Sequence, residues 1–212
     1  MIAANNIAGV VLAGGQSRRM GGQDKSWIDI GGTPAITRAC TRLTPQVAHL
    51  AINTNADPHP FHALNHPILA DTLKDFPGPL AGVLSAMRWA QALDSITHIV
   101  TAATDTPFFP TDYVERLAWQ AIEPDSIVMA KSSGWVHPVF ALWPIDLADA
   151  LEAYLTVENQ RKILMFSERY DNRMVEFEDQ PDPFFNVNTP EDLVAAQARL
   201  TETRTVSKQD QP

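Results

Sequence analysis

The chain has 212 residues, of which 45% are hydrophobic and 19% are charged. These values are typical of one globular domain with a substantial core, and they argue against global disorder. Lys and Arg number 16 against 25 Asp and Glu, so the formal net charge is -9. This balance argues against a general nucleic-acid or anionic-membrane binder, because such surfaces need clustered basic side chains.

The charge is unevenly distributed along the chain. Residues 16–42 hold five basic and two acidic side chains, a net charge of +3, which leaves -12 for the remainder. A positive segment in an acidic protein predicts a local anion site. The single cysteine, Cys40, cannot form an intramolecular disulfide, and no signal peptide or transmembrane-length apolar run is visible. We therefore expect a cytoplasmic protein.

Strands and helices alternate in the first half of the chain. The apolar run 7–13 predicts a strand buried on both faces, and a glycine-rich polar loop follows from Gly14 to Asp24. Thr33 and Pro34 favour a helix start, as cap and first helical residue. Further strands are predicted at 47–53, 67–71 and 96–103, with helices at 79–93 and from a Thr111 cap to about residue 121.

The second half has a less regular pattern. Strands are predicted at 126–130, 137–143, 173–177 and 184–187, and helices at 145–155 and 161–170. The sequence Thr-Pro-Glu-Asp from Thr189 is typical of a helix start, and this helix is expected to end near Leu200. We expect residues 201–212 to form a flexible tail.

This alternation predicts an α/β fold with a single Rossmann-like domain over residues 1–200. Its sheet is expected to be mainly parallel, with helices on both faces and a small mixed β extension. Ligands of such sheets bind outside the carboxyl ends of the strands. The loop after Ala13, together with Asn53, Asp71 and Asp105, follows predicted strand ends and is expected to line one crevice.

The loop from Leu12 to Lys25 reads Leu-Ala-Gly-Gly-Gln-Ser-Arg-Arg-Met-Gly-Gly-Gln-Asp-Lys. Its glycines allow backbone amides to approach an anion, and Arg18, Arg19 and Lys25 add full charges. The spacing fits neither a Walker loop, nor G-x-G-x-x-G, nor a nucleophile elbow. A solvated surface loop is the alternative, but three basic residues directly after a buried strand favour a phosphate site.

The same loop resembles the signature of Mg-dependent nucleotidyltransferases. Three further motifs narrow the resemblance: Pro-Gly-Pro-Leu-Ala-Gly at 77–82, Asp-Thr-Pro at 105–107 and Phe-Asn-Val-Asn-Thr-Pro at 185–190. Together they resemble the molybdenum cofactor guanylyltransferases, the bacterial MobA family, from Ile7 to Leu200. The resemblance implies Mg²⁺-dependent transfer of GMP from GTP to the terminal phosphate of molybdopterin or Mo-molybdopterin, with release of pyrophosphate. Residues 7–110 would then form a nucleotide-binding half and residues 111–200 an acceptor-binding half.

The resemblance also implies roles for single residues. The catalytic residues would be Arg19, Lys25 and Asp105. The basic side chains of Arg19 and Lys25 would bind the triphosphate, and Asp105 would hold Mg²⁺, which prefers oxygen ligands. His137, Asn186 and Asn188 would lie on the acceptor side. The GTP-binding set would be Leu12, Ala13, Gly14, Gly15, Lys25, Asn53, Asp71, Gly78, Pro79, Gly82 and Asp105.

Other interpretations stay open at the level of sequence. Asn53, Asp71 and Asp105 are each compatible with simple turn or strand-end roles. A cytidylyltransferase acting on the same pterin, or a sugar-nucleotide enzyme, would share the loop, although Gly15 favours the guanylyl branch. A non-catalytic nucleotide-binding or carrier protein is a further alternative. The family suggests a monomer that meets cofactor-biosynthesis proteins and apo-molybdoenzymes.

Two sets of aromatic side chains are compatible with structural roles alone. His59, His62 and His66 are interleaved with prolines and have no cysteine partner, which favours a surface loop over a zinc site. The pair Trp135 and Trp143 is expected to serve packing rather than stacking on the pterin.

Overall fold

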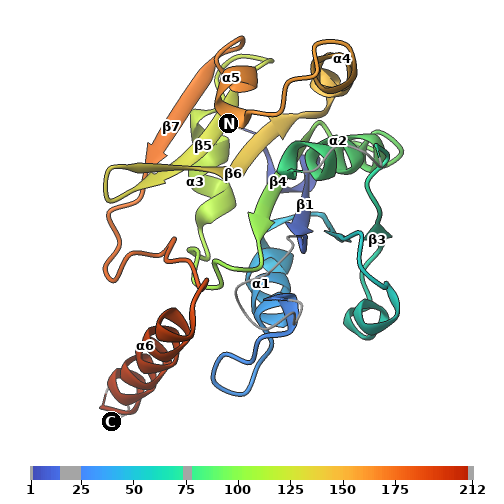
Figure 1. The fold of residues 1–212 in the computed structure, drawn as a ribbon. Helices are drawn as coiled ribbons and strands as arrows, with labels where there is room; N and C mark the ends of the chain where they lie inside the picture. The colour runs from blue at the N-terminus through green and yellow to red at the C-terminus, as the bar shows by residue number, and fades with distance from the viewer. Residues whose placement is uncertain (1, 15–24, 74–77, 210–212) are drawn as a thin grey trace.

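The structure is a computed structural model that describes residues 2–14, 25–73 and 78–209, with side chains described as far as Thr201. Seven strands form one sheet in the order β3-β2-β1-β4-β6-β5-β7 (Figure 1). The strands are β1 (Ile7–Leu12), β2 (His49–Asn53), β3 (Ile68–Leu69), β4 (His98–Ala103), β5 (Ile127–Ser132), β6 (Trp135–Pro144) and β7 (Asn172–Glu176).

The sheet is mostly parallel, as predicted. β6 runs antiparallel to both of its neighbours, β4 and β5, whereas β7 pairs with β5 in parallel. The mixed β extension is therefore part of the same sheet. Residues 184–187, predicted as a strand, form none. Two of their amides are used elsewhere, because Phe184 donates to the Asp182 carboxylate and Val187 to the Asp105 carbonyl.

Helices cover both faces of the sheet, which confirms the predicted layers (Figure 1). α1 and α3 pack on one face, and α2, α4 and α5 pack on the other. The helices are α1 (Ala35–Leu43), α2 (Pro79–Ala90), α3 (Tyr113–Gln120), α4 (Ala148–Thr156), α5 (Ile163–Ser167) and α6 (Pro190–Gln209). Within the described ranges, none combines the length and the apolar character needed to cross a bilayer.

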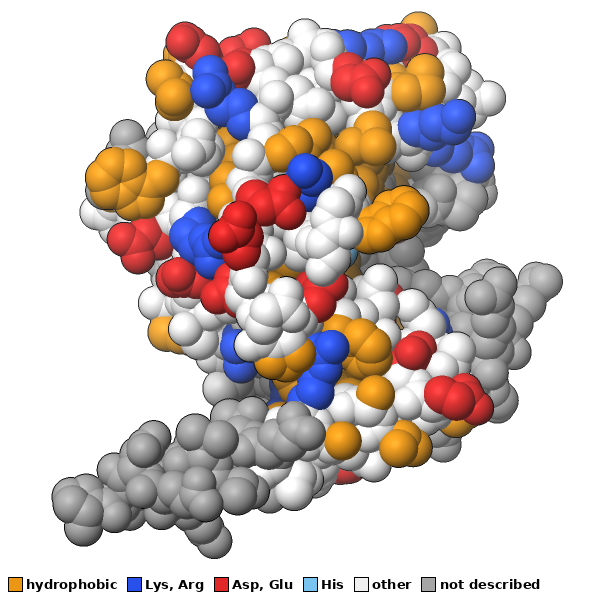
Figure 2. Space-filling model, turned by 90° about the vertical axis from the view of Figure 1, so that its left-hand side faces the viewer, with side chains coloured by type: hydrophobic (Ala, Val, Ile, Leu, Met, Phe, Trp, Pro, Cys, Tyr) orange, Lys and Arg blue, Asp and Glu red, His pale blue; other side chains and the backbone are white. Residues whose placement is uncertain are grey.

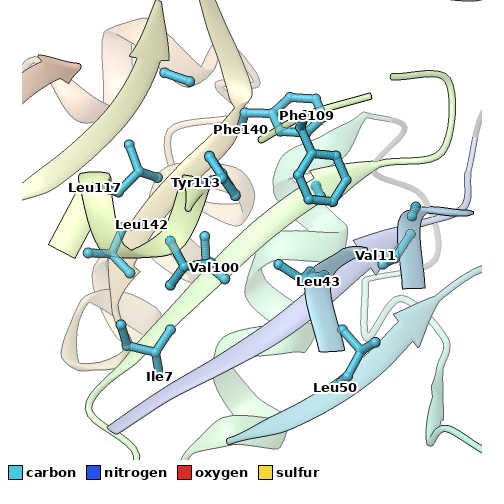
Figure 3. Packing of buried hydrophobic residues seen from close by; sticks show 14 of the residues in the cluster. Ile7, Val11, Leu43, Leu50, Val100, Phe109, Tyr113, Leu117, Phe140 and Leu142 are labelled. Atoms are coloured by element: carbon cyan, nitrogen blue, oxygen red, sulfur yellow. The ribbon is translucent and has the colours of Figure 1, made fainter. Parts of the chain in front are cut away.

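The core on the α1 and α3 face is continuous across the chain's two halves (Figure 3). Val11 and Val100 from the parallel strands contact the same cluster as Leu142 of β6 and Tyr113 of α3. Cys40 lies in this core, and burial raises the pKa of its thiol to about 12. The thiol is thus a structural apolar group rather than a nucleophile.

Several helix ends differ from the sequence prediction: α2 ends at Ala90, α4 begins at Ala148 after a short 3-10 helix, and α5 is confined to Ile163–Ser167. α1 begins at Ala35 with Pro34 in the cap position, and α3 has Asp112 as its cap instead of Thr111. α6 continues to Gln209, beyond the predicted end near Leu200. The last turns mix good helix formers such as Glu, Arg, Lys and Gln with weaker ones such as Thr, Ser and Val, so composition alone does not mark this helix end.

Candidate functional site

Four neighbouring strands end at the same level of the sheet. Leu12 of β1 pairs with Asn53 of β2 on one side and with Ala103 of β4 on the other, and Asn53 pairs with Leu69 of β3. The residues that follow these strands therefore meet at one carboxyl edge, as predicted. This edge is where open α/β sheets bind their ligands.

Asp71 is held at this edge by two asparagine side chains. The Nδ2 of Asn53 donates to one carboxylate oxygen at 2.9 Å, and the Nδ2 of Asn55 donates to the other at 2.7 Å. Asn55 also accepts a hydrogen bond from the Asp71 amide at 2.9 Å. The carboxylate is thus fixed in orientation while its remaining lone pairs stay available to a ligand.

The start of α2 lies against the same cluster. Gly78, with a φ of 128°, precedes the helix, and Pro79 occupies its first turn. A Cβ on Gly82 would collide with the Asn53 amide oxygen and lie 3.1 Å from the Leu12 Cδ2 atom. The glycine therefore permits close contact between α2 and the ends of β1 and β2.

Lys25 and Asn188 meet from opposite ends of the chain. The Lys25 Nζ donates to the Asn188 Oδ1 at 2.7 Å across a separation of 163 residues. Asn188 is held by a capping box, in which the Asp192 carboxylate accepts from the amides of Asn188 and Thr189 while Thr189 Oγ1 accepts from the Asp192 amide. The predicted phosphate lysine and the predicted acceptor segment are therefore in direct contact.

Asp105 lies beside this contact. The Val187 amide donates to its carbonyl at 2.7 Å, and the Thr106 hydroxyl lies near both the Asp105 carboxylate, at 3.2 Å, and the Asn186 amide oxygen. Burial raises the pKa of the Asp105 carboxyl, against the opposing effects of the Thr106 hydrogen bond and the Lys25 charge. A bound cation would compensate this burial.

These residues fit Mg²⁺. Among the described residues, no group of three or more His, Cys, Asp or Glu side chains is arranged to hold a metal. The described residues would thus supply at most two such ligands, with Asp105 as one of them. Mg²⁺ is often bound by one or two carboxylates, with substrate phosphates and water completing its shell. The donor set suits a cation that arrives with a nucleotide.

His137 lies against the chain segment that leads to Asn186. Its ring stacks on Phe184, with centroids 4.7 Å apart, and its Nε2 is 2.8 Å from the Ser132 hydroxyl. Ser132 is in turn 2.8 Å from the Asp182 carboxylate. Burial lowers the pKa of His137, with the Asp182 charge acting in the opposite direction.

The positive segment 16–42 serves more than one purpose. Gly15, Arg18 and Arg19 lie outside the described residues. Arg38 donates to the Ile30 carbonyl, and Arg42 to the carbonyls of Phe108 and Phe109. These two arginines brace loops with backbone bonds, which corrects the interpretation of the whole segment as an anion site.

The two tryptophans of the predicted pair differ in burial. Trp143 is buried and donates its indole N–H to Thr101 Oγ1 at 3.1 Å. Trp135, next to the turn between β5 and β6, is 77% exposed, so the packing role predicted for it is wrong.

Figure 2 shows acidic and basic side chains interspersed on the side of the molecule that faces left in Figure 1.

Known proteins resemble this chain in sequence and fold. A family described as the MobA-like NTP transferase domain matches residues 9–173. The chain belongs to this family. The match includes Lys25, Asn53, Asp71 and Asp105, and it ends before Asn186 and Asn188.

Relatives of this MobA-like chain extend the match. A molybdenum cofactor guanylyltransferase of Mesorhizobium japonicum is 47% identical, covering 94% of this chain and 98% of the relative. One of Rhizobium johnstonii is 44% identical, with coverages of 94% and 96%. The crystal structure of molybdopterin-guanine dinucleotide biosynthesis protein A from Archaeoglobus fulgidus has a TM-score of 0.73 at 25% identity and covers 92% of this chain and 99% of its own. The family resemblance and the fold class are confirmed.

Several residues of this MobA-like site were not predicted from the sequence. The predicted residues are held in place by Asn55, Thr106, Ser132 and Asp182. For Asn55 and Thr106 the sequence offers one signal, which is that each lies close in the chain to a predicted site residue. Asn55 lies two residues after Asn53, and Thr106 directly follows Asp105. Ser132 and Asp182 meet across 50 residues, which no local motif announces.

Proposed function

We propose that this chain transfers GMP from GTP to the terminal phosphate of molybdopterin, with or without its metal, and releases pyrophosphate. The observation that carries the proposal is the 2.7 Å contact between Lys25 and Asn188 beside Asp105. It brings the end of the glycine-rich loop and the acceptor segment to one point. The names of relatives that are 44–47% identical supply the substrate class.

The nucleotide is proposed to lie along the ends of β1, β2 and β3. Leu12, Ala13 and Gly14 would contact it through the backbone, while Asn53 and Asp71 would bind the guanosine part. Asp71 suits this role because two asparagines fix its carboxylate, which leaves lone pairs for N–H or O–H donors of the nucleoside. Gly78, Pro79 and Gly82 would let the start of α2 approach the base and ribose.

The chemistry is a direct displacement at phosphorus. An oxygen of the acceptor phosphate attacks the α-phosphorus of GTP, one P–O bond forms, and the bond to the β-phosphate breaks with its electron pair leaving on pyrophosphate. No protein nucleophile is required. The chain's contribution is alignment and charge neutralisation, with Lys25 and Arg19 donating to phosphate oxygens. Mg²⁺, when held by Asp105, supplies further neutralisation of the phosphate oxygens.

The decisive experiment is a turnover assay of the purified full chain. Pyrophosphate release is measured with Mg²⁺, molybdopterin and each of the four NTPs in turn. We expect release with GTP only, dependent on both the acceptor and Mg²⁺. Preference for CTP would indicate a cytidylyltransferase, and tight GTP binding without release would indicate a carrier; either result would reject the proposal.

Lys25→Met tests the proposed charge role within the same assay. The substitution keeps the apolar stem and removes the ammonium, so we expect turnover to fall by about 100-fold or more, as for other electrostatic groups at phosphoryl centres. The free energy of unfolding should change by less than about 1 kcal/mol, because a partly exposed polar contact contributes little. Lys162→Met, at an exposed position, is the matched control and should leave both quantities unchanged. Equal losses of stability and turnover in Lys25→Met would argue against the role.

A further inference from the structure

A bulge in β6 re-aims the His137 side chain. Met129 of β5 pairs with Ala141, but the next residue, Ala130, pairs with His137, so residues 138–140 are extra on the β6 side. Bulges next to active sites commonly redirect a side chain. Here the ring is placed on Phe184, with an interplanar angle of 18°, and the buried Phe184 ring is itself packed against Phe140 at 5.1 Å. The plane of the imidazole is thus fixed.

The Ser132 hydroxyl contacts two groups but has only one proton. Its oxygen is 2.8 Å from the His137 Nε2 and 2.8 Å from the Asp182 Oδ1. Burial acts to raise the pKa of Asp182, but the Phe184 amide, Ser132 and His137 outweigh it, so the pKa lies below its usual value. An ionised carboxylate only accepts hydrogen bonds. The Ser132 proton therefore goes to Asp182, and the Ser132 oxygen is left to accept from His137.

This proton count determines the tautomer of the ring. If Ser132 accepts from His137, the Nε2 atom must carry hydrogen, and a neutral imidazole then has a bare lone pair on Nδ1. The ring is half-buried, so it keeps an accessible edge. Phe184, on which it stacks, lies two residues before Asn186, which contacts Thr106 beside Asp105. The ring therefore lies against the segment that is proposed to bind the acceptor.

We propose that Ser132 and Asp182 are positioning residues that hold His137 as its Nε2-protonated tautomer, so that Nδ1 accepts a hydrogen bond from a ring N–H of the acceptor. The inference rests on the proposed function, in which the acceptor is a pterin with N–H donors at one end and a phosphate at the other. A lone pair repels phosphate oxygens, which are themselves acceptors. His137 therefore recognises the heterocycle and leaves the phosphate to Lys25 and Asp105.

The tautomer is tested directly by NMR on the ligand-free full chain. The ¹⁵N chemical shifts of the two His137 ring nitrogens distinguish a protonated from a bare nitrogen. We expect a protonated Nε2 and a bare Nδ1 in the wild type, and converging shifts in Ser132→Ala, where the ring loses its acceptor. Ser126→Ala is the matched control, because Ser126 is a buried serine at the other end of β5 that also donates to an aspartate, Asp171. A wild-type proton on Nδ1 would overturn the proposal.

Steady-state kinetics then test whether the His137 Nδ1 lone pair contacts molybdopterin. Ser132→Ala should raise the KM for molybdopterin by up to about tenfold, the effect of one lost hydrogen bond, with kcat and the KM for GTP changed less than twofold. Ser126→Ala should change none of the three constants. Unchanged ¹⁵N shifts together with an unchanged molybdopterin KM in Ser132→Ala would reject the positioning role.

Two substitutions of His137 itself separate the two ring nitrogens. The amide of His137→Asn sits near the Nδ1 position and retains an acceptor oxygen there, whereas the amide of His137→Gln extends toward Ser132. His137→Asn should therefore keep a lower molybdopterin KM than His137→Gln, and the reverse order would overturn the assignment of Nδ1. A wild-type chain without guanylyl transfer would reject the proposed function and this ligand with it, while the NMR result would still decide the tautomer.

Discussion

At position 82 the contact between α2 and the end of β2 leaves room for hydrogen only. The Asn53 amide oxygen occupies the space that a Cβ would need, and the Leu12 Cδ2 atom lies 3.1 Å away from it. Asn53 in turn donates to Asp71. A single methyl group at position 82 would therefore disturb the proposed nucleoside site by way of Asn53.

Gly82→Ala should raise the KM for GTP by about tenfold and lower the free energy of unfolding by about 1–3 kcal/mol, the usual cost of overpacking a close contact. Both are measurable, by pyrophosphate release and by urea unfolding. In an Asn53→Ala background the same substitution should cost little or even stabilise the helix, because alanine favours helices by about 1 kcal/mol over glycine. An equal cost in both backgrounds would show that Asn53 is not the obstacle.

The sequence predicts the site residues that strand ends expose, and it misses those that hold them. Asn53, Asp71 and Asp105 are recognisable because a buried apolar run stops just before each. Ser132 and Asp182 are ordinary polar residues until the fold brings them together, 50 residues apart. Arg42 shows a similar limit: the sequence counts it in the positive segment 16–42, but its side chain donates to the backbone carbonyls of Phe108 and Phe109.

Among the elements, α6 positions the acceptor segment. Its side chains Leu193, Ala196 and Leu200 pack with Ile28, Ile30 and Val187 in a small cluster of their own. Ile28 follows the short helix η2 (Lys25–Trp27), and Val187 precedes Asn188. The helix therefore joins the two segments whose side chains, Lys25 and Asn188, make contact.

Ala196→Asp tests this role of α6. Ala196 is fully buried, so an unpaired carboxylate there should cost about 3 kcal/mol or more of stability. We expect kcat/KM for GTP to fall in parallel at temperatures where the chain is still folded, because the Lys25 segment loses its support. Ala195→Asp makes the same change on the exposed side of the same helix and should leave unfolding and kinetics unaltered. Similar losses in both variants would contradict the assignment.

The sequence predicts the strands of the sheet better than it predicts residues 184–187, which lead into the site. Apolar runs between turn residues mark β1, β2, β4 and β5, since burial on both faces requires continuous hydrophobicity, whereas the partly exposed β7 mixes polar and apolar residues. Residues 184–187 also look apolar, but Phe184 contributes to an aromatic cluster with Phe140 and Phe177 instead of to a ladder. Tertiary packing decides between these outcomes, and a short apolar run does not encode it.

At the scale of the whole molecule, the proposed nucleotide-binding half and acceptor-binding half share one sheet and its cores. β4, from residues 7–110, pairs with β6, from residues 111–200, along the centre of the sheet. Val100 and Leu142 lie in one cluster, and Ile99 and Trp143 lie in the other. The boundary at residue 110 is therefore a difference in proposed ligand and not a boundary between folding units.

A fragment of residues 1–110 should consequently fail to fold by itself. Its β4 would lose the β6 ladder, which leaves an open edge, and both apolar clusters would lose the residues that segments after 110 contribute in the full chain, which favours aggregation. We expect no cooperative urea transition for this fragment, in contrast to the full chain. Co-expression with residues 111–212 should restore a folded complex that binds GTP, because every strand pair then has its partner. A cooperative transition of fragment 1–110 alone would show that the nucleotide-binding half is a domain in its own right.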